Sequence, residues 1–264
     1  MPETQLQRSV ESQASPDRVA SEIIANLERL GLADLPARPF DCAFSVICAP
    51  PAKKKLVVVG LNGSLADAGL TNRVAVERDL ANPEESELER RLAGGWTVER
   101  PRDKRTQESG KPRQFTTLAK RLEALPGKLG FKLDGTIYTN SLLLCSDGAD
   151  KIKETAEDEP IGSYEELRVR SMQFFEEVTL AISEPELIVA YSNSLGPFSA
   201  AQILYERFGQ GQLRHYASGD RPKTWGFVAH TRGRRIPVVG IYHLSRFPPN
   251  ENEIREVRQK LSEA

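Results

Sequence analysis

The sequence is poor in cysteine and histidine, with three of each among 264 residues. Three cysteines without a CxxC pair cannot form a disulfide framework or supply all four ligands of an iron–sulfur cluster. The histidines, His215, His230 and His243, stand too far apart along the chain for the usual zinc-ligand spacing. We therefore expect no metal centre, and we interpret the cysteines as small buried hydrophobic residues.

The sequence also lacks an excess of charge and any long hydrophobic run. Lys and Arg number 36 against 37 Asp and Glu, a net charge of −1, which excludes a polybasic coat protein. The apolar runs at residues 56–59 and 187–191 are too short to span a membrane. The polar N-terminus has none of the features of a signal peptide, so we expect a cytoplasmic protein that does not bind membranes.

Charge is segregated along the chain. Acids outnumber bases 12 to 4 over residues 147–186, whereas bases outnumber acids 9 to 3 over residues 101–132 and 7 to 1 over residues 211–247. The two basic stretches either form one positive face or are ordinary solvated loops.

The chain is expected to form one domain. Residues 1–14 are polar and are expected to be a disordered tail, and residues 15–264 form the domain. The charge-dense residues at about 77–113 are expected to be a mobile insertion with one short helix near residues 84–92.

Short apolar runs alternate with stretches of helical spacing, which predicts an α/β protein. Helices are predicted at residues 16–30, 116–125, 163–182, 197–208 and 251–261, and strands at 55–60, 136–144, 186–191, 225–230 and 236–242. The last two strands should pair through residues 232–234. Strands without polar alternation are buried on both faces. We therefore expect a three-layer α/β/α sandwich with a central, mainly parallel sheet of about four strands.

Polar side chains follow the predicted strands, where open α/β sheets bind their ligands. Asn62, Asn140 and Asn193 come after, or at the end of, the first three parallel strands, and His243 comes after the last. An amide donates and accepts hydrogen bonds at once, which suits recognition of a nucleobase edge.

Three of these motifs, in this order, resemble those of the uracil-DNA glycosylase superfamily. The first is Gly60-Leu61-Asn62-Gly63, where the family has GxNP or GQDP. The second is Thr139-Asn140, and the third, His243-Leu244-Ser245, stands where the family has HPS. The resemblance covers roughly residues 40–262.

The resemblance implies an enzyme of DNA repair that hydrolyses the N-glycosidic bond of a flipped-out uracil or related base, acting as a monomer. Asn62 would orient the attacking water, since an amide cannot serve as a general base. His243 would stabilise the charge that develops on the departing base. The partner is DNA containing uracil or a damaged base, and the mechanism requires no metal or organic cofactor.

The resemblance also assigns contact residues. Asn140 would read the base edge, in a base-binding site completed by Gly60, Leu61 and Gly63. The expected DNA contacts are Ser245, Arg246 and Phe247, with Phe247 as the wedge that fills the vacated stack.

The sequence departs from the family pattern at two prolines, replaced here by Gly63 and Leu244. These departures bear on catalysis more than on fold. The aromatic residue that would stack on the base is not assigned by any motif, and Trp96 and Phe115 are the candidates.

Other interpretations remain open. Asn62 and Gly63 alone are typical of a turn. The fold could bind a nucleobase or nucleic acid without cleaving it. A serine hydrolase is a further alternative, with Ser194 as nucleophile, His243 as base and Asp220 as the acid. A dinucleotide site is less favoured, because Asn62 stands where a glycine should approach the pyrophosphate.

Overall fold

The computed structural model describes residues 16–37, 54–63, 70–80, 117–133, 135–146, 148–209, 211–218 and 224–263. The expected N-terminal tail, the expected helix near residues 84–92 and the side chains of Trp96, Phe115 and Asp220 lie outside these ranges. Among the residues that are described, no helix is both long enough and apolar enough to cross a membrane.

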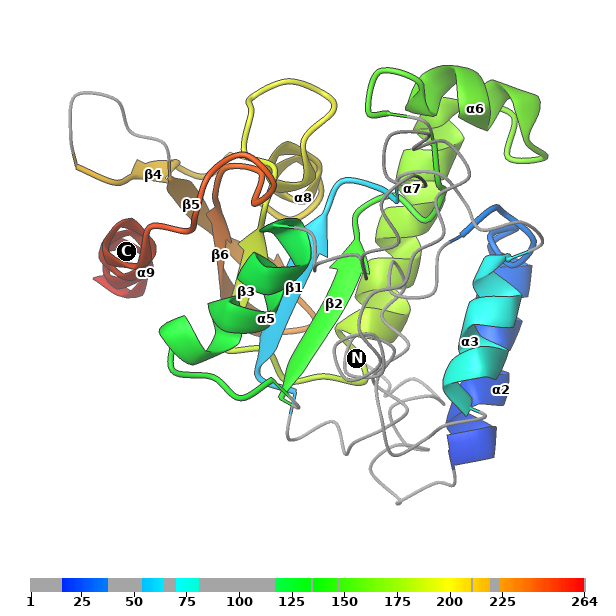
Figure 1. Ribbon diagram of the computed structural model, residues 1–264, viewed down its shortest axis with the longest axis horizontal. Helices are drawn as coiled ribbons and strands as arrows, with labels where there is room; N and C mark the ends of the chain where they lie inside the picture. The colour runs from blue at the N-terminus through cyan, green and yellow to red at the C-terminus, as the bar shows by residue number, and fades with distance from the viewer. Residues whose placement is uncertain are drawn as a thin grey trace, which may run out of the picture.

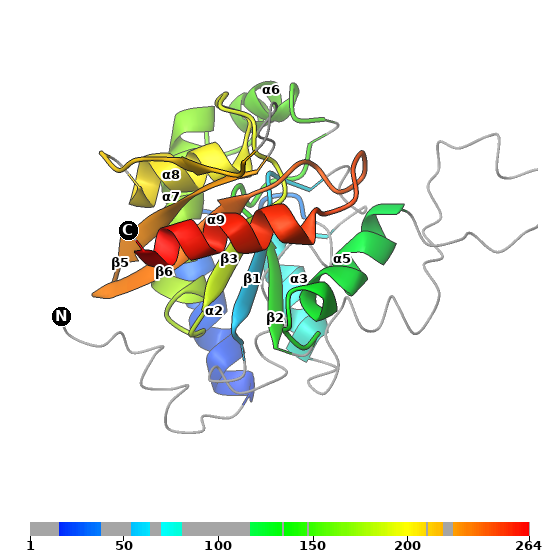
Figure 2. The same ribbon diagram turned by 90° about the vertical axis from the view of Figure 1, so that its left-hand side faces the viewer.

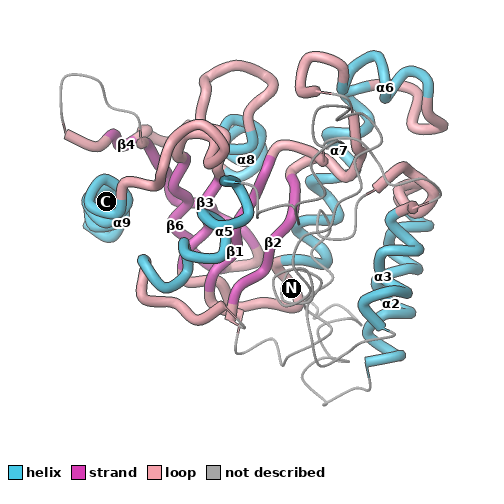
Figure 3. Tube along the Cα trace, viewed as in Figure 1, coloured by secondary structure: helices cyan, strands magenta, loops and turns pink. Residues whose placement is uncertain are grey.

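A mixed six-stranded sheet forms the centre of the molecule (Figures 1 and 3). Its strands are β1 (Leu56–Gly60), β2 (Thr136–Asn140), β3 (Leu187–Ala190), β4 (His215–Tyr216), β5 (Trp225–Thr231) and β6 (Arg234–Gly240). They are arranged in the order β2-β1-β3-β6-β5-β4. The first four of this order are parallel, whereas β5 and β4 pair antiparallel at one edge. The mainly parallel α/β sheet is confirmed, and the expected hairpin adds β5 at its edge. Two-residue β4 was not predicted, and with it the sheet has six strands rather than about four.

Helices cover both faces of the sheet (Figure 2). They are α2 (Pro16–Arg29), α3 (Asn72–Leu80), α5 (Thr117–Lys128), α6 (Ile152–Asp158), α7 (Tyr164–Phe174), α8 (Ala200–Phe208) and α9 (Glu251–Glu263). Side chains of α5 and α9 pack with Val58 and Val189 on one face. Those of α2, α7 and α8 pack with Val57 and Ile188 on the other. Alternate residues of the buried strands thus serve two cores, as expected of a parallel sheet covered on both sides.

Local sequence accounts for several element boundaries. Ser163 caps α7 by accepting a hydrogen bond from the Glu166 N–H. Gly31 follows α2 with a φ of 65°. The predicted hairpin turns at Arg232 and Gly233, with φ of 52° and 73°, the left-handed pair that matches the twist of the flanking strands.

Four expectations are corrected. Residues 77–80 belong to α3, so the expected insertion at 77–113 begins with helix. Strand β2 ends at Asn140 rather than at residue 144. Helix α6 was not predicted. The long helix predicted at residues 163–182 is α7 continued by a π-helical segment, Phe175–Thr179.

The parallel strands bring their carboxyl ends to one edge of the sheet. Gly60 at the end of β1 is in register with Asn140 at the end of β2. On the other side the Tyr191 N–H bonds to the Val59 carbonyl, and the Ile241 N–H to the Ala190 carbonyl. The segments that follow these strands therefore begin side by side.

Candidate functional site

The first group of side chains meets at Gly60. A Cβ at this position would collide with Asn140 Oδ1 and with the hydroxyl of Tyr191. Both side chains are largely buried, with 5% and 9% of their surface exposed. The ends of β1, β2 and β3 thus place an amide and a phenol hydroxyl in one small space that exists only because residue 60 has no side chain.

Tyr191 connects this group to the segment after β6. Its ring makes an edge-to-face contact with the imidazole of His243, with 5.5 Å between ring centroids and an interplanar angle of 63°. Gly60, Asn140 and His243 come from motifs far apart in the sequence. Tyr191 lies between them: its hydroxyl and Asn140 Oδ1 both border the space at Gly60, and its ring contacts His243.

The hydrogen bonds of His243 fix its tautomer. The backbone N–H of Ser245 donates to His243 Nδ1 at 3.2 Å, and Ser245 Oγ lies 2.7 Å from the same nitrogen. Because a backbone N–H can only donate, Nδ1 accepts, and the neutral ring carries its proton on Nε2. His243 is exposed as a residue, but partial desolvation of its ring, together with the charge of Arg246, lowers its pKa below the ordinary value of 6.5. The ring is therefore a neutral donor at pH 7.

The segment after β6 is anchored at Leu244. Its side chain is fully buried in the core shared with α5 and α9. Its carbonyl accepts a hydrogen bond of 2.6 Å from Arg121 of α5. The N–H groups of Arg246 and Phe247 both donate to the His243 carbonyl, closing a turn. These contacts hold the segment although position 244 is not a proline.

The side chain of Asn62 has a defined orientation. Its Nδ2 donates to the Gly63 carbonyl at 2.8 Å and to Ser146 Oγ at 2.7 Å. The Ser146 hydroxyl donates its hydrogen bond to the Gly148 carbonyl, so its oxygen must accept from Asn62. The amide nitrogen is therefore committed, and Oδ1 is left as an acceptor. The φ of Asn62 is not positive, so Asn62 does not occupy the left-handed turn position that an asparagine tolerates.

The rest of the first motif is bound to the segment that follows β2. The Leu61 carbonyl accepts from Ser141 Oγ and from the Leu142 N–H, and the Gly63 carbonyl accepts from the Ser146 N–H. The Leu61 side chain is buried in the core on the α7 face of the sheet. The carbonyls of Leu61 and Gly63 are therefore engaged by the segment after β2, and the Leu61 side chain belongs to the core.

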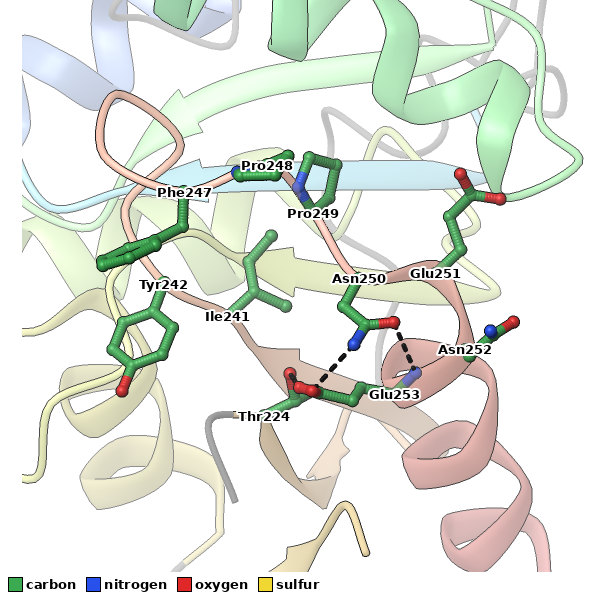
Figure 4. A pocket seen from close by; sticks show the side chains of 10 residues that line it. All are labelled: Thr224, Ile241, Tyr242, Phe247, Pro248, Pro249, Asn250, Glu251, Asn252 and Glu253. Atoms are coloured by element: carbon green, nitrogen blue, oxygen red, sulfur yellow. Dashed lines mark hydrogen bonds between the residues drawn. The ribbon is translucent and has the colours of Figure 1, made fainter. Parts of the chain in front are cut away.

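The three expected DNA contacts lie on the exposed side of the segment after β6. Ser245, Arg246 and Phe247 are all exposed. Arg246 makes no ion pair with any residue that the structure describes, whereas Ser245 is engaged with His243. The ring of Phe247 lies 5.0 Å from that of Tyr242 (Figure 4).

The geometry does not support the hydrolase alternative. Ser194 is exposed, and within the described ranges no hydrogen bond joins it to His243. Helix α8 begins at Ala200, six residues further on, and Ser194 lacks the positive φ of a strained elbow. The same ranges contain no cluster of three side chains suited to a metal ion.

Two residues of the site were missed by the sequence analysis. Tyr191 looked like the last apolar residue of a strand, and Ser146 like one of several loop serines. A tyrosine at the end of a buried strand is a weak signal for a polar role, since its hydroxyl needs a partner. Nothing in the sequence points to Ser146.

Comparison of the chain with known family models and with curated proteins finds no match to either.

Proposed function

We propose that the protein is a uracil-DNA glycosylase-like enzyme that removes a flipped-out uracil or related base from DNA. The observation that carries this proposal is the convergence of Gly60, Asn140 and His243 around Tyr191 at the carboxyl edge of the sheet. The helices on both sheet faces support assignment to the three-layer α/β/α sandwich of that superfamily. Because one chain supplies all these residues, we propose that it acts as a monomer.

In the proposed reaction, the buried amide of Asn140 pairs with the base edge, offering one donor and one acceptor. The bond between the base nitrogen and sugar C1′ breaks, and its electron pair stays on the base. The sugar passes through an oxocarbenium-like state. His243 Nε2–H donates to the base oxygen on which negative charge develops.

Water completes the hydrolysis at C1′. Asn62 Oδ1, the atom left free by the fixed amide nitrogen, accepts a hydrogen bond from that water and orients its lone pair toward the sugar. The proton that the water loses passes to solvent, since an amide does not accept it. Arg246 binds a DNA phosphate, and Phe247 occupies the space that the base leaves.

The test is incubation with labelled oligonucleotides that carry uracil in single strands or opposite guanine or adenine, followed by alkali to cleave abasic sites. We expect cleavage by the wild type and by Ser194→Ala, and loss of cleavage in Asn62→Ala and His243→Ala. A fluorophosphonate probe should leave Ser194 unlabelled.

Salt-sensitive binding without cleavage would support the alternative of a non-catalytic nucleic-acid-binding relative. If the protein neither cleaves nor binds these oligonucleotides, the proposal is contradicted for these substrates.

A further inference from the structure

A pocket lies along the segment after β6 that carries His243 (Figure 4). Its volume is about 550 Å³, within the usual range for small-ligand sites. The segment from Ile241 to Glu253 supplies nearly all of its lining, and Thr224 supplies the rest. Of the residues that line the pocket, the mechanism proposed above uses Phe247 alone.

One wall of this pocket is an exposed aromatic pair. The rings of Tyr242 and Phe247 are 5.0 Å apart with an interplanar angle of 43°, and 38% and 45% of their surfaces are exposed. Between these residues the chain directs His243 toward Tyr191 and buries Leu244. The same segment therefore offers an imidazole to the candidate site and two aromatic rings to the neighbouring pocket.

The floor of the pocket is a fixed carboxylate. Glu253 Oε2 accepts from Thr224 Oγ1 at 2.6 Å, and Glu253 Oε1 accepts from Asn250 Nδ2 at 2.8 Å. The Glu253 N–H donates back to Asn250 Oδ1, so that Asn250 caps the start of α9. Each carboxylate oxygen has a second lone pair, so both can accept a further N–H.

The charge of the lining distinguishes between possible occupants. Among the described residues that line the pocket, Glu251 and Glu253 are charged and none is a Lys or Arg. Glu251 is held by Lys128 at 2.9 Å. Two carboxylates disfavour a phosphate, whereas aromatic rings and N–H acceptors suit a flat, neutral ring that bears an amino group.

We propose that this pocket is a second base-binding subsite. It takes the base next to the flipped-out one on the same strand, stacked against Tyr242 and donating its amino group to Glu253. Adenine and cytosine are therefore preferred there over thymine. The inference rests on the proposed function, because Arg246 and His243 must hold the same strand for its neighbouring base to reach Tyr242.

The test uses single-stranded uracil oligonucleotides in which one neighbour of the uracil is adenine, thymine or a base-less tetrahydrofuran spacer, on the 5′ or the 3′ side. Stacking of one base on an aromatic side chain is substantial, so on one side the spacer should raise the KM of the wild type roughly tenfold. With adenine as the neighbour, Tyr242→Ala should raise KM as much as the spacer raises the KM of the wild type. With the spacer as the neighbour, the same substitution should cause no further increase. Thymine should give a KM between those of adenine and the spacer.

Two variants make the test specific. Tyr216→Ala removes another tyrosine that is 38% exposed, on the edge strand β4, and should leave KM unchanged for every substrate. Glu253→Gln keeps the size of the side chain but removes half of its accepting capacity, so the preference for adenine over thymine should shrink.

The inference is overturned if the spacer has no effect on either side, or if Tyr242→Ala raises KM to the same extent for all neighbours. In both cases uracil is still excised, so the proposed function survives. If no uracil oligonucleotide is cleaved or bound, the proposed function fails, and the subsite is rejected with it.

Discussion

The segment after β1 and the segment after β6 face the same edge of the sheet but are held in different ways. Residues 60–63 lie beside the segment that follows β2, whose backbone N–H groups donate to the carbonyls of Gly60, Leu61 and Gly63. Residues 243–247 close a turn on themselves, and the side chain of Leu244 is their main contact with the core. One half of the site is part of the sheet, and the other half is attached to it.

Under the proposed function, this difference corresponds to a division of roles. The amides of Asn62 and Asn140 lie in the half that is fixed by backbone pairing, where orientation matters most for a water or a base edge. Arg246 and Phe247 lie on the exposed half, where a nucleic acid can reach them. His243 belongs to the exposed segment but is held against the fixed half by Tyr191.

The largest expected effect comes from removing the anchor of the second segment. Leu244 is fully buried, so Leu244→Ala should lower the free energy of unfolding by about 3 kcal/mol, as the same substitution of buried leucines does in other proteins. Chemical denaturation measures this change. Leu195→Ala is the control, because Leu195 lies at the same edge but is 57% exposed, and its change should stay within about 0.5 kcal/mol. Equal effects of the two substitutions would refute the anchoring role.

The next effect comes from the fixed half. In Gly60→Ala the new Cβ displaces the Asn140 amide and the Tyr191 hydroxyl. The rate of uracil excision should therefore fall by roughly 100-fold, the size of effect that small misplacements of active-site groups have in other enzymes. Gly196→Ala is the matched control. Its nearest neighbour would be Ser194 Oγ at 3.9 Å, and its activity should equal that of the wild type. Full activity in Gly60→Ala would contradict the placement of these two groups in the site.

A smaller effect is expected when Asn62 loses its orienting partner. Ser146→Ala removes one hydrogen bond to the amide, which should lower kcat by about tenfold and leave KM unchanged. Ser183→Ala removes another buried serine, bound to the Thr179 carbonyl ahead of β3, and should affect stability but not kcat. A change confined to KM in Ser146→Ala would show that Asn62 binds substrate rather than positions water.

The smallest effect concerns pH. The working form of His243 is neutral, and its pKa is lowered by partial desolvation of its ring and then by Arg246, so kcat should persist below pH 6.5 before it falls. Between the lowered pKa and pH 6.5, His243 binds more protons in the unfolded state than in the folded state. The free energy of unfolding therefore rises with pH through this range, and it falls as pH drops from 6.5 toward the lowered pKa.

Arg246→Gln tests the cause of the lowered pKa. It removes the neighbouring charge, so the pKa of His243 should move up toward 6.5, and the acid limb of kcat should move with it. Titration of the ring by NMR in the free protein measures the pKa directly. Arg235→Gln, on the exposed hairpin, should leave it unchanged.

Much of this arrangement follows from the sequence. Runs such as LVVVG at residues 56–60 are buried on both faces and predict parallel strands, and parallel strands bring the residues that follow them to one edge. This reasoning predicted that Asn140 and His243 would lie at the same edge as the first motif. The Arg232-Gly233 turn likewise predicted the hairpin.

The rest depends on contacts between distant segments. Tyr191 can take part in the site because Gly60 leaves room for its hydroxyl. Ser146 can orient Asn62 because its hydroxyl donates to the Gly148 carbonyl and so must accept from the amide. Strand β4 has two residues and leaves no periodic pattern. Helix α3 buries few apolar side chains, so its charged end looked like the start of an insertion.

The most direct test of the central claim is the release of free base. Mass spectrometry should detect free uracil from a single-stranded uracil oligonucleotide incubated with the wild type. Release should be lost in His243→Ala and retained in Ser194→Ala. Release of no base by the wild type, or equal release by His243→Ala, would contradict a glycosylase centred on His243.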